Sequence, residues 1–168
     1  MKKAMILVAA CLVIALAYAS VTYVHEGYVG VLDTGDGPRL LDRGPHLKPP
    51  RAEVTFYPTR CREIHLTTVD EGVDGTIEFD VILLLSVSRD KVIQLHEAYG
   101  GSYVERLISP LVVEHFRLQG SGSRDWGDGI GSEPAAEGIV ERINSEGAPQ
   151  GINIVGARIR SFNVSLTE

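Results

Sequence analysis

An uncharged segment near the N-terminus constrains this chain more than any other feature. From Ala4 to Val24 the sequence has 21 residues without a charged side chain, and Lys2 and Lys3 precede them. An α-helix of that length rises about 30 Å, which matches the hydrocarbon thickness of a bilayer. We therefore expect residues 1–24 to form a transmembrane anchor that contacts membrane lipid through Ala4–Val24.

The residues around this segment predict its orientation. Lysines precede it, and the acidic residues Glu26 and Asp33 follow it. Positively charged flanks favour the cytoplasmic side of a membrane, and aromatic residues such as Tyr18 and Tyr23 favour its interfaces. We expect a single-pass membrane protein with a cytoplasmic N-terminus and the rest of the chain on the extracytoplasmic (periplasmic) side.

Two other interpretations of the segment stay open. Ala17-Tyr18-Ala19 has the small-x-small pattern of a signal-peptidase site, and cleavage there would release a mature chain that begins at Ser20. The sequence before Cys11 resembles a lipoprotein cleavage box, but apolar rather than polar residues follow it. All three interpretations send the remaining chain across a membrane, and they differ only in whether it stays attached.

Residues 25–168 have the composition of one globular domain. The chain is 44% hydrophobic and 23% charged, and this part is long enough to bury a single core. The net charge of −6 becomes −8 without Lys2 and Lys3, and no basic cluster offsets it, which argues against nucleic acid as a partner. Because Cys11 lies in the apolar segment, it cannot pair with Cys61, and no disulfide framework is expected.

The first half of this domain is predicted to be mainly β structure. The proline-rich Gly44–Pro50 is expected to form no regular element, because proline removes backbone donors. The alternation in Thr76–Ser88 predicts one face that is buried throughout, and Ile82 and Leu84 predict that the middle of the other face is covered too. Shorter strands are predicted at Tyr28–Leu32, Arg39–Leu41, Val54–Tyr57 and Glu63–Val69.

The second half is predicted to alternate helices with a final strand. Asp90 is expected to cap a helix over Lys91–Tyr99, and the pattern Ser102-Tyr103-Val104-Glu105 predicts a capping box at the start of a second helix. Pro110 is expected to kink or divide that second helix. Three further elements are predicted. They are a glycine-rich flexible loop over Gln119–Gly131, a helix from Ser132 to about Glu146 with Ile139, Val140 and Ile143 inward, and a strand with bulges or strong curvature over Gly151–Leu166.

The sequence shows no recognisable catalytic constellation. Cys61 has no identifiable partner base, and the acidic residues around Trp126 lack the remaining ligands of a calcium loop. The five histidines have no metal-ligand spacing. We therefore predict no enzyme and no catalytic, cofactor-binding or metal site. The histidines are His25, His46, His65, His96 and His115.

Four segments, in chain order, resemble the SPFH or Band 7 domain of stomatins, prohibitins and flotillins. Each motif is structural, and together the four cover nearly the whole chain. They are Val24–Val31, similar to the strand that follows the membrane segment; Gly44–Pro50, similar to a proline-rich turn; Asp70–Ser88 with Tyr103, Ile108, Pro110, Glu114 and Arg117 after it; and Gly151–Ile159, similar to a late strand.

The resemblance implies an α+β fold, with an SPFH/Band 7-like domain over residues 25–168 and a mostly antiparallel, curved sheet packed by helices. It implies a non-enzymatic, membrane-anchored scaffold or adaptor that assembles with itself or with homologous SPFH subunits. Such assemblies organise the membrane or modulate a partner such as a membrane protease. The alternative function is a secreted or periplasmic binding module, released by cleavage after Ala19.

The sequence departs from the family pattern in two places. Family members usually continue past the last strand into a long charged coiled-coil helix, whereas this sequence ends at Glu168, and its last predicted helix is interrupted by Gly138 and Gly147. We therefore expect a small assembly, or a subunit within another protein's ring, rather than a large self-closed cage. Trp126, in the predicted loop, is a candidate anchor for a partner, and folding of its side chain back onto the core is the alternative.

Overall fold

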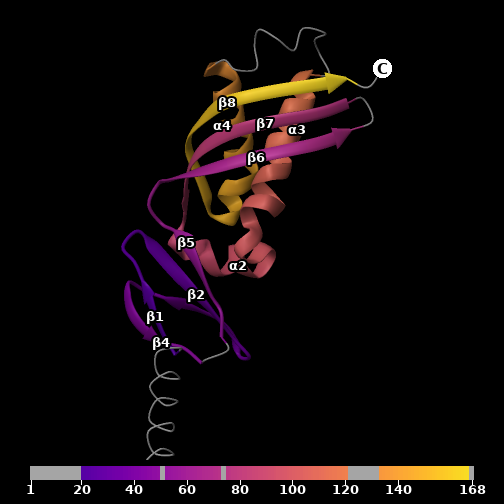
Figure 1. The fold of residues 1–168 in the computed structure, drawn as a ribbon. Helices are drawn as coiled ribbons and strands as arrows, with labels where there is room; N and C mark the ends of the chain where they lie inside the picture. Colours follow the sequence, from indigo (N-terminus) through magenta and orange to yellow (C-terminus); the bar gives the residue numbers. More distant parts are fainter. Residues whose placement is uncertain (1–19, 50–51, 73–74, 121–132, 167–168) are drawn as a thin grey trace, which may run out of the picture. The chain divides into compact units, whose positions relative to one another are not determined.

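The computed structural model describes residues 20–49, 52–72, 75–120 and 133–166 (Figure 1). The chain divides into two compact units, Met1–Tyr57 and Pro58–Glu168. Within the described residues the strands form three sheets, where the sequence had suggested one curved sheet. The α-helices among the described residues all belong to the second unit, so the α+β class is confirmed while the sheet is more divided than expected.

The first unit contains two small sheets. Strand β1 (Val21–Val24) pairs antiparallel with β4 (Gly44–Leu47). Strand β2 (Tyr28–Thr34) lies between β3 (Gly37–Leu41) and β5 (Val54–Pro58). The strands predicted around residues 28–32, 39–41 and 54–57 are therefore confirmed.

Two predictions for this unit are wrong. Val21–Val24 form a strand, so the predicted apolar helix cannot continue to Val24. Gly44–Leu47 form a strand despite Pro45, because β4 has only β1 as a neighbour in the described structure, and an edge strand tolerates a residue without an N–H. The backbone N–H of Lys48 donates to the carbonyl of Ser20 at 2.8 Å and extends this β1–β4 ribbon by one more bond.

No helix in the described ranges has both the length and the apolar character needed to cross a bilayer. Residues 1–19, which contain most of the predicted anchor, lie outside the described residues.

A small cluster of buried side chains holds the first unit together. Val24, Leu32 and Leu41 form this cluster, and Tyr28 and Val54 pack against it. Gly30 lies so close to it that an added Cβ would lie 3.2 Å from Val24 Cγ2 and 3.2 Å from Val54 Cγ1. A side chain at this position would require these neighbours to shift, so glycine eases the close approach of β2.

The second unit is built on a three-stranded antiparallel sheet with β7 at its centre. The order is β6 (Arg62–Gly72), β7 (Gly75–Val87) and β8 (Ile152–Leu166). The register between β7 and β8 shifts between Asp80 and Val81 and again between Leu84 and Leu85. These shifts confirm the bulges that the changing apolar phase of the last strand had predicted.

Two helices, α3 (Ser109–Gly120) and α4 (Glu133–Gly147), cover one face of this sheet (Figure 1). The remaining helix, α2 (Val92–Tyr99), follows β7. Four short helical segments connect these elements. They are η1 (Arg89–Lys91), η2 (Gly100–Ser102), the π-helical η3 (Val104–Ile108) and η4 (Ala148–Gln150).

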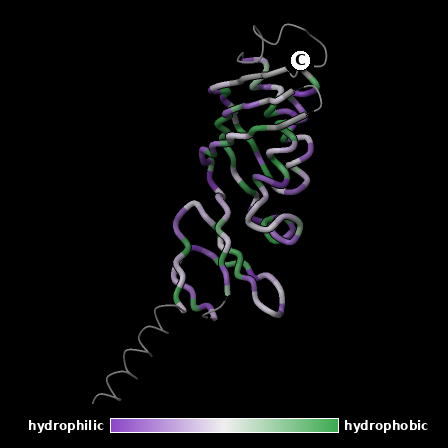
Figure 2. The backbone as a smooth tube through the Cα atoms, turned by 45° about the vertical axis from the view of Figure 1, so that its right-hand side comes forward, coloured by the Kyte–Doolittle hydropathy of each residue, from purple (hydrophilic) through white to green (hydrophobic). Residues whose placement is uncertain are grey.

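The core of the second unit lies between β7 and these helices, and Figure 2 shows hydrophobic residues concentrated there. The ring centroids of Phe79 on β7 and Phe116 on α3 are 5.0 Å apart, and both side chains are fully buried. Ile139 and Ile143 of α4 point inward, as predicted, while Val140 is only half-buried. The other buried side chains of β7 are Val81, Leu83, Leu85 and Val87.

The opposite face of the sheet differs from the prediction. Leu84 is 38% exposed, although its apolar neighbours in sequence had suggested a covered position. Both helices that pack on the sheet lie on its other face, so nothing in the described structure covers Leu84. This open face is polar at Glu78 and half-buried at Ile82.

The predicted helix caps are wrong, because helical turns already precede both sites. Asp90 lies within η1, and Lys91 rather than Asp90 occupies the N-cap of α2 without a side-chain cap bond. Ser102 likewise lies within η2, and the N-cap of η3 is Tyr103, again without a side-chain cap bond. An N-cap residue must have an extended backbone, which these turns do not allow.

Pro110 divides the second helix as predicted. The π-helical turn η3 ends immediately before α3, and the N–H of Ser109 bonds to the carbonyl of Val104. Pro110 follows with no N–H to donate, so the wider turn lies where a regular α-helical bond is lost. Helix α3 continues to Gly120, and residues 121–132, with Trp126, lie outside the described residues.

One side chain of α4 fixes the edge of β8. The side-chain amide nitrogen of Asn144 donates to the carbonyl of Ile154 at 2.8 Å, and its oxygen accepts from the N–H of Ile154 at 2.8 Å. This pair of bonds replaces the neighbouring strand that Ile154 lacks on this side. Asn144 therefore joins the helix layer to the sheet at the bulge near Val155.

We expect Asn144→Ala to lower the free energy of unfolding by about 2 kcal/mol, because the partly buried N–H and C=O of Ile154 lose their partners. Asn153→Ala, an exposed neighbour on β8, should change it by less than about 0.5 kcal/mol. Urea unfolding followed by circular dichroism measures both. Equal effects of the two variants would contradict this role of Asn144.

Candidate functional site

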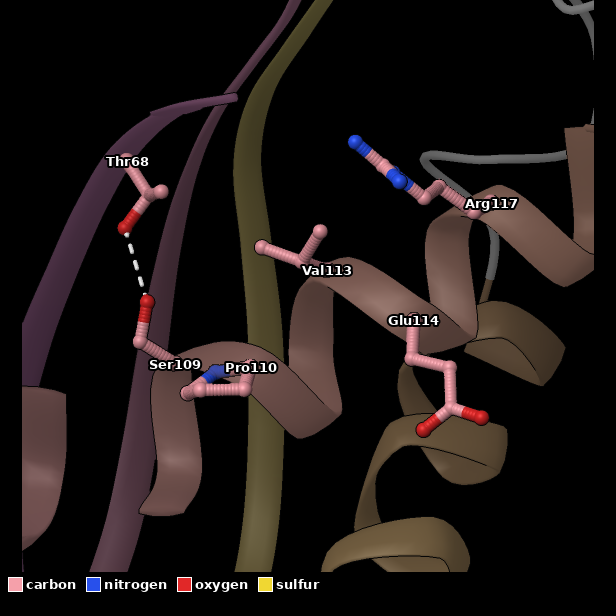
Figure 3. A pocket seen from close by; sticks show the side chains of 6 residues that line it. All are labelled: Thr68, Ser109, Pro110, Val113, Glu114 and Arg117. Atoms are coloured by element: carbon pink, nitrogen blue, oxygen red, sulfur yellow. Dashed lines mark hydrogen bonds between the residues drawn. The ribbon is translucent and has the colours of Figure 1, made fainter. Parts of the chain in front are cut away.

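A groove lies between β6 and α3 in the second unit. It has a volume of about 420 Å³. One lining residue, Thr68, comes from β6, and the others come from successive turns of α3 (Figure 3). The residues of α3 are Ser109, Pro110, Val113, Glu114 and Arg117.

Apolar and charged side chains both line the groove. Pro110 and Val113 supply apolar surface, while Glu114 and Arg117 are exposed. The hydroxyls of Thr68 and Ser109 are 3.2 Å apart and hydrogen-bond to each other, which ties β6 to the start of α3. Such a surface can bind an apolar side chain, but it holds no nucleophile paired with a base.

A polar cluster joins α3 to α4 beside the groove. Arg142 Nη2 donates to Glu114 Oε2 at 2.8 Å and lies 2.9 Å from Glu146 Oε1. The hydrogen bond with Glu114 raises the pKa of Arg142, and the charges of Glu114 and Glu146 add to this effect. Because all three side chains are substantially exposed, we take this cluster to orient the helices rather than to supply much stability.

His115 lies at the same helix interface, and its pKa is lowered from the ordinary value. Burial lowers its pKa from the ordinary value of 6.5, a hydrogen bond with the backbone of Ala135 partly opposes this, and the charge of Arg142 lowers it further. Its Nε2 atom is buried without a hydrogen-bond partner among the described atoms. The structure therefore favours neutral His115.

The structure does not bring the other histidines together. His25 and His65 are exposed, His46 bonds to the carbonyl of Asp42, and His96 is buried in α2. No group of three or more His, Cys, Asp or Glu side chains in the described ranges has an arrangement that could hold a metal ion. Cys61 is an exposed free thiol.

A second notable surface lies on the β1–β4 ribbon of the first unit. Leu47 is 81% exposed, and its pairing partner Val21 is 49% exposed. Tyr23, two residues further along the same strand, is also 49% exposed. Three large apolar side chains thus lie exposed on this ribbon, whose strand β1 forms the last four residues of the uncharged segment Ala4–Val24.

The comparison with protein families decides the identity of the chain. The family model described as SPFH domain / Band 7 family matches residues 22–165. The chain belongs to this family. Among curated proteins, no match was found. Family membership confirms the resemblance inferred from the four sequence segments.

SPFH-domain proteins are generally membrane-associated scaffolds without enzymatic activity, and they generally self-assemble. In this chain, the family pattern and the groove overlap: Pro110, Glu114 and Arg117 match the motif and also line the groove. The motif therefore gave a signal for this surface, although it could not show that Thr68 on β6 completes it. Nor did the sequence show that Arg142 and Glu146 join Glu114.

The titration of His115 leads to a test of stability against pH. An unfolded chain binds a proton to His115 near pH 6.5, whereas the folded chain resists protonation until a lower pH. The free energy of unfolding should therefore fall as the pH drops below about 6.5, and His115→Gln should reduce this slope. Urea unfolding of both proteins between about pH 7 and pH 5 measures it. Parallel profiles for the two proteins would contradict the assignment.

Proposed function

We propose that this SPFH-domain chain is a non-enzymatic, membrane-anchored scaffold or adaptor subunit. The observation that supports it best is the continuity between the uncharged segment Ala4–Ser20 and the exposed apolar side chains of the β1–β4 ribbon. A ribbon that exposes Leu47, Val21 and Tyr23 directly after an apolar segment suits the interface of a bilayer, where apolar and aromatic side chains are favoured.

The proposed topology follows from the charges. Lys2 and Lys3 before the segment place the N-terminus in the cytoplasm, and the described units lie on the extracytoplasmic side. With Val21–Val24 in a strand and Ser20 bonded to the ribbon, the 16 residues from Ala4 to Ala19 remain for a membrane-spanning helix, close to the lower limit of about 17. In this position the scaffold assembles with itself or joins a ring of homologous SPFH subunits.

The family supports a scaffold rather than a catalyst. An assembly of such subunits at the membrane surface organises lipid or modulates a partner membrane protein, such as a protease. The groove beside α3, which apolar and charged side chains both line, offers this subunit a contact surface of its own.

One observation favours a second function, a secreted or periplasmic binding module. Ser20, the residue after the Ala17-Tyr18-Ala19 pattern, makes the first backbone bond of the β1–β4 ribbon, to Lys48. Cleavage after Ala19 would therefore leave every described bond of the ribbon in place. The groove would then serve as the binding surface of a released protein.

Membrane fractionation separates the two functions. The scaffold predicts that the full chain, expressed in a bacterial host, resists extraction by alkaline carbonate and keeps its original N-terminus at Met1 or Lys2. A mature chain that begins at Ser20 and is recovered in the soluble fraction would refute the anchor and support the binding module.

A second experiment tests the ribbon itself. In a chain with Cys11→Ser and Cys61→Ser, a fluorophore at Leu47→Cys should be quenched by nitroxide lipids in reconstituted vesicles, because Leu47 lies in the bilayer interface. The matched control is Leu118→Cys, which is 60% exposed on α3 and should be quenched much less. Similar quenching at both positions would show that the ribbon does not contact lipid.

A further inference from the structure

We propose that copies of this chain assemble head to tail through the edges of the sheet in the second unit. In this arrangement the second half of β8 in one copy pairs with β6 of the next copy, so that the sheet continues from subunit to subunit. The inference rests on the proposed scaffold function and names the surfaces through which the scaffold subunits join.

Both edge strands have backbone groups available for pairing. Because β7 is central, β6 and β8 each have one neighbour within the described sheet, and alternate residues of each direct their N–H and C=O groups outward. On β8, Asn144 occupies the outer edge at Ile154. Beyond the bulge at Val155, the strand continues over Gly156–Leu166, which is as long as the 11 residues of β6.

The charges of the two strands are complementary. Strand β6 contains Glu63, Asp70 and Glu71 against a single Arg62, whereas β8 contains Arg158 and Arg160 and no acidic residue. Arg160 lies 3.5 Å from Asp80 of the same chain, so Arg158 is the exposed cation that remains for a neighbour. Opposite charges on facing edges favour the pairing of β8 with β6 over the pairing of either strand with itself.

The same charges disfavour the symmetric alternatives. Pairing of β6 with β6 of another copy would bring two acidic strands together, and pairing of β8 with β8 would bring two basic strands together. Like charges on directly opposed strands are destabilising. The interface is therefore heterologous, and such an interface generates a ring when the rotation closes and a filament when it does not.

The helix side of the sheet also fits this arrangement. On β8, the buried Ile152 and Ile154 are followed by Ala157 and Ile159, which are only half-buried within one chain. These two face the helix side, because they pair with the buried Leu83 and Val81. If β8 of a neighbouring copy pairs with β6, its helix-side residues lie toward the groove that Pro110 and Val113 help to line. Small apolar side chains such as Ala157 would then contact apolar surface there.

Strand direction is consistent with a closed assembly. Both β6 and β8 run antiparallel to β7 and hence parallel to each other. If neighbouring copies are related by rotation about an axis that runs along the strands, β8 of one copy can pair in parallel with β6 of the next. Every copy then uses one edge of each kind.

Charge reversal tests the pairing in the full chain in mild detergent, with mass measured by light scattering after size exclusion. We expect the unaltered chain to form oligomers, and Glu63→Arg or Arg158→Glu alone to raise the dissociation constant about tenfold or more, because each places like charges across the interface. An equimolar mixture of the two variants, or the double variant Glu63→Arg/Arg158→Glu, should restore the original mass.

Glu97→Arg on α2 and Arg106→Glu on η3 are the matched controls, since both residues are exposed and lie away from the sheet edges. They should leave the mass unchanged. Oligomers whose mass is unaffected by both Glu63→Arg and Arg158→Glu would overturn the β8–β6 pairing. An effect of Glu63→Arg alone would also overturn it, because another protein would then occupy β6. A monomeric but carbonate-resistant chain would also overturn it while leaving the proposed membrane anchoring intact.

Discussion

The burial of one face of β7 against α3 and α4 is the interaction on which the second unit depends. Phe79, Val81, Leu83 and Leu85 are fully inaccessible to solvent on that face, while Leu84 on the other is 38% exposed. A sheet covered on one side only leaves both edge strands and the opposite face available for other contacts. The one-sided core therefore accounts for the stability of the unit and for the exposure of Leu84 on the opposite face of the sheet.

Much of the fold was predictable because strand and helix periodicities are local. The alternation in Thr76–Ser88 and the changing phase in Gly151–Leu166 predicted the central strand and the bulged edge strand correctly. Failures came where the environment decided the outcome. Pro45 could join a strand because β4 is an edge, and Asp90 and Ser102 could not act as caps because turns already preceded them. Likewise, the apolar side chain of Leu84 did not indicate that the helices pack on the opposite face of the sheet.

The candidate surfaces were predictable only in part, since each combines residues that are distant in the sequence. The family motif pointed to Pro110, Glu114 and Arg117, but Thr68 enters the groove through the register of β6 and its bond to Ser109. The exposed ribbon depends on the pairing of Val21 with Leu47, which no local pattern specified. Pairing and packing across such separations depend on the tertiary structure, which a local sequence pattern does not specify.

Hydrogen–deuterium exchange tests most directly whether the sheet edges join subunits. It is measured on the full chain in mild detergent, at protein concentrations above and below that at which the oligomer dissociates. We expect backbone amides in β6 and in the second half of β8 to exchange more slowly in the oligomer, while those of α4 do not change. Exchange in both strands that is independent of concentration, or slowing confined to other elements such as β1 and β4, would contradict it.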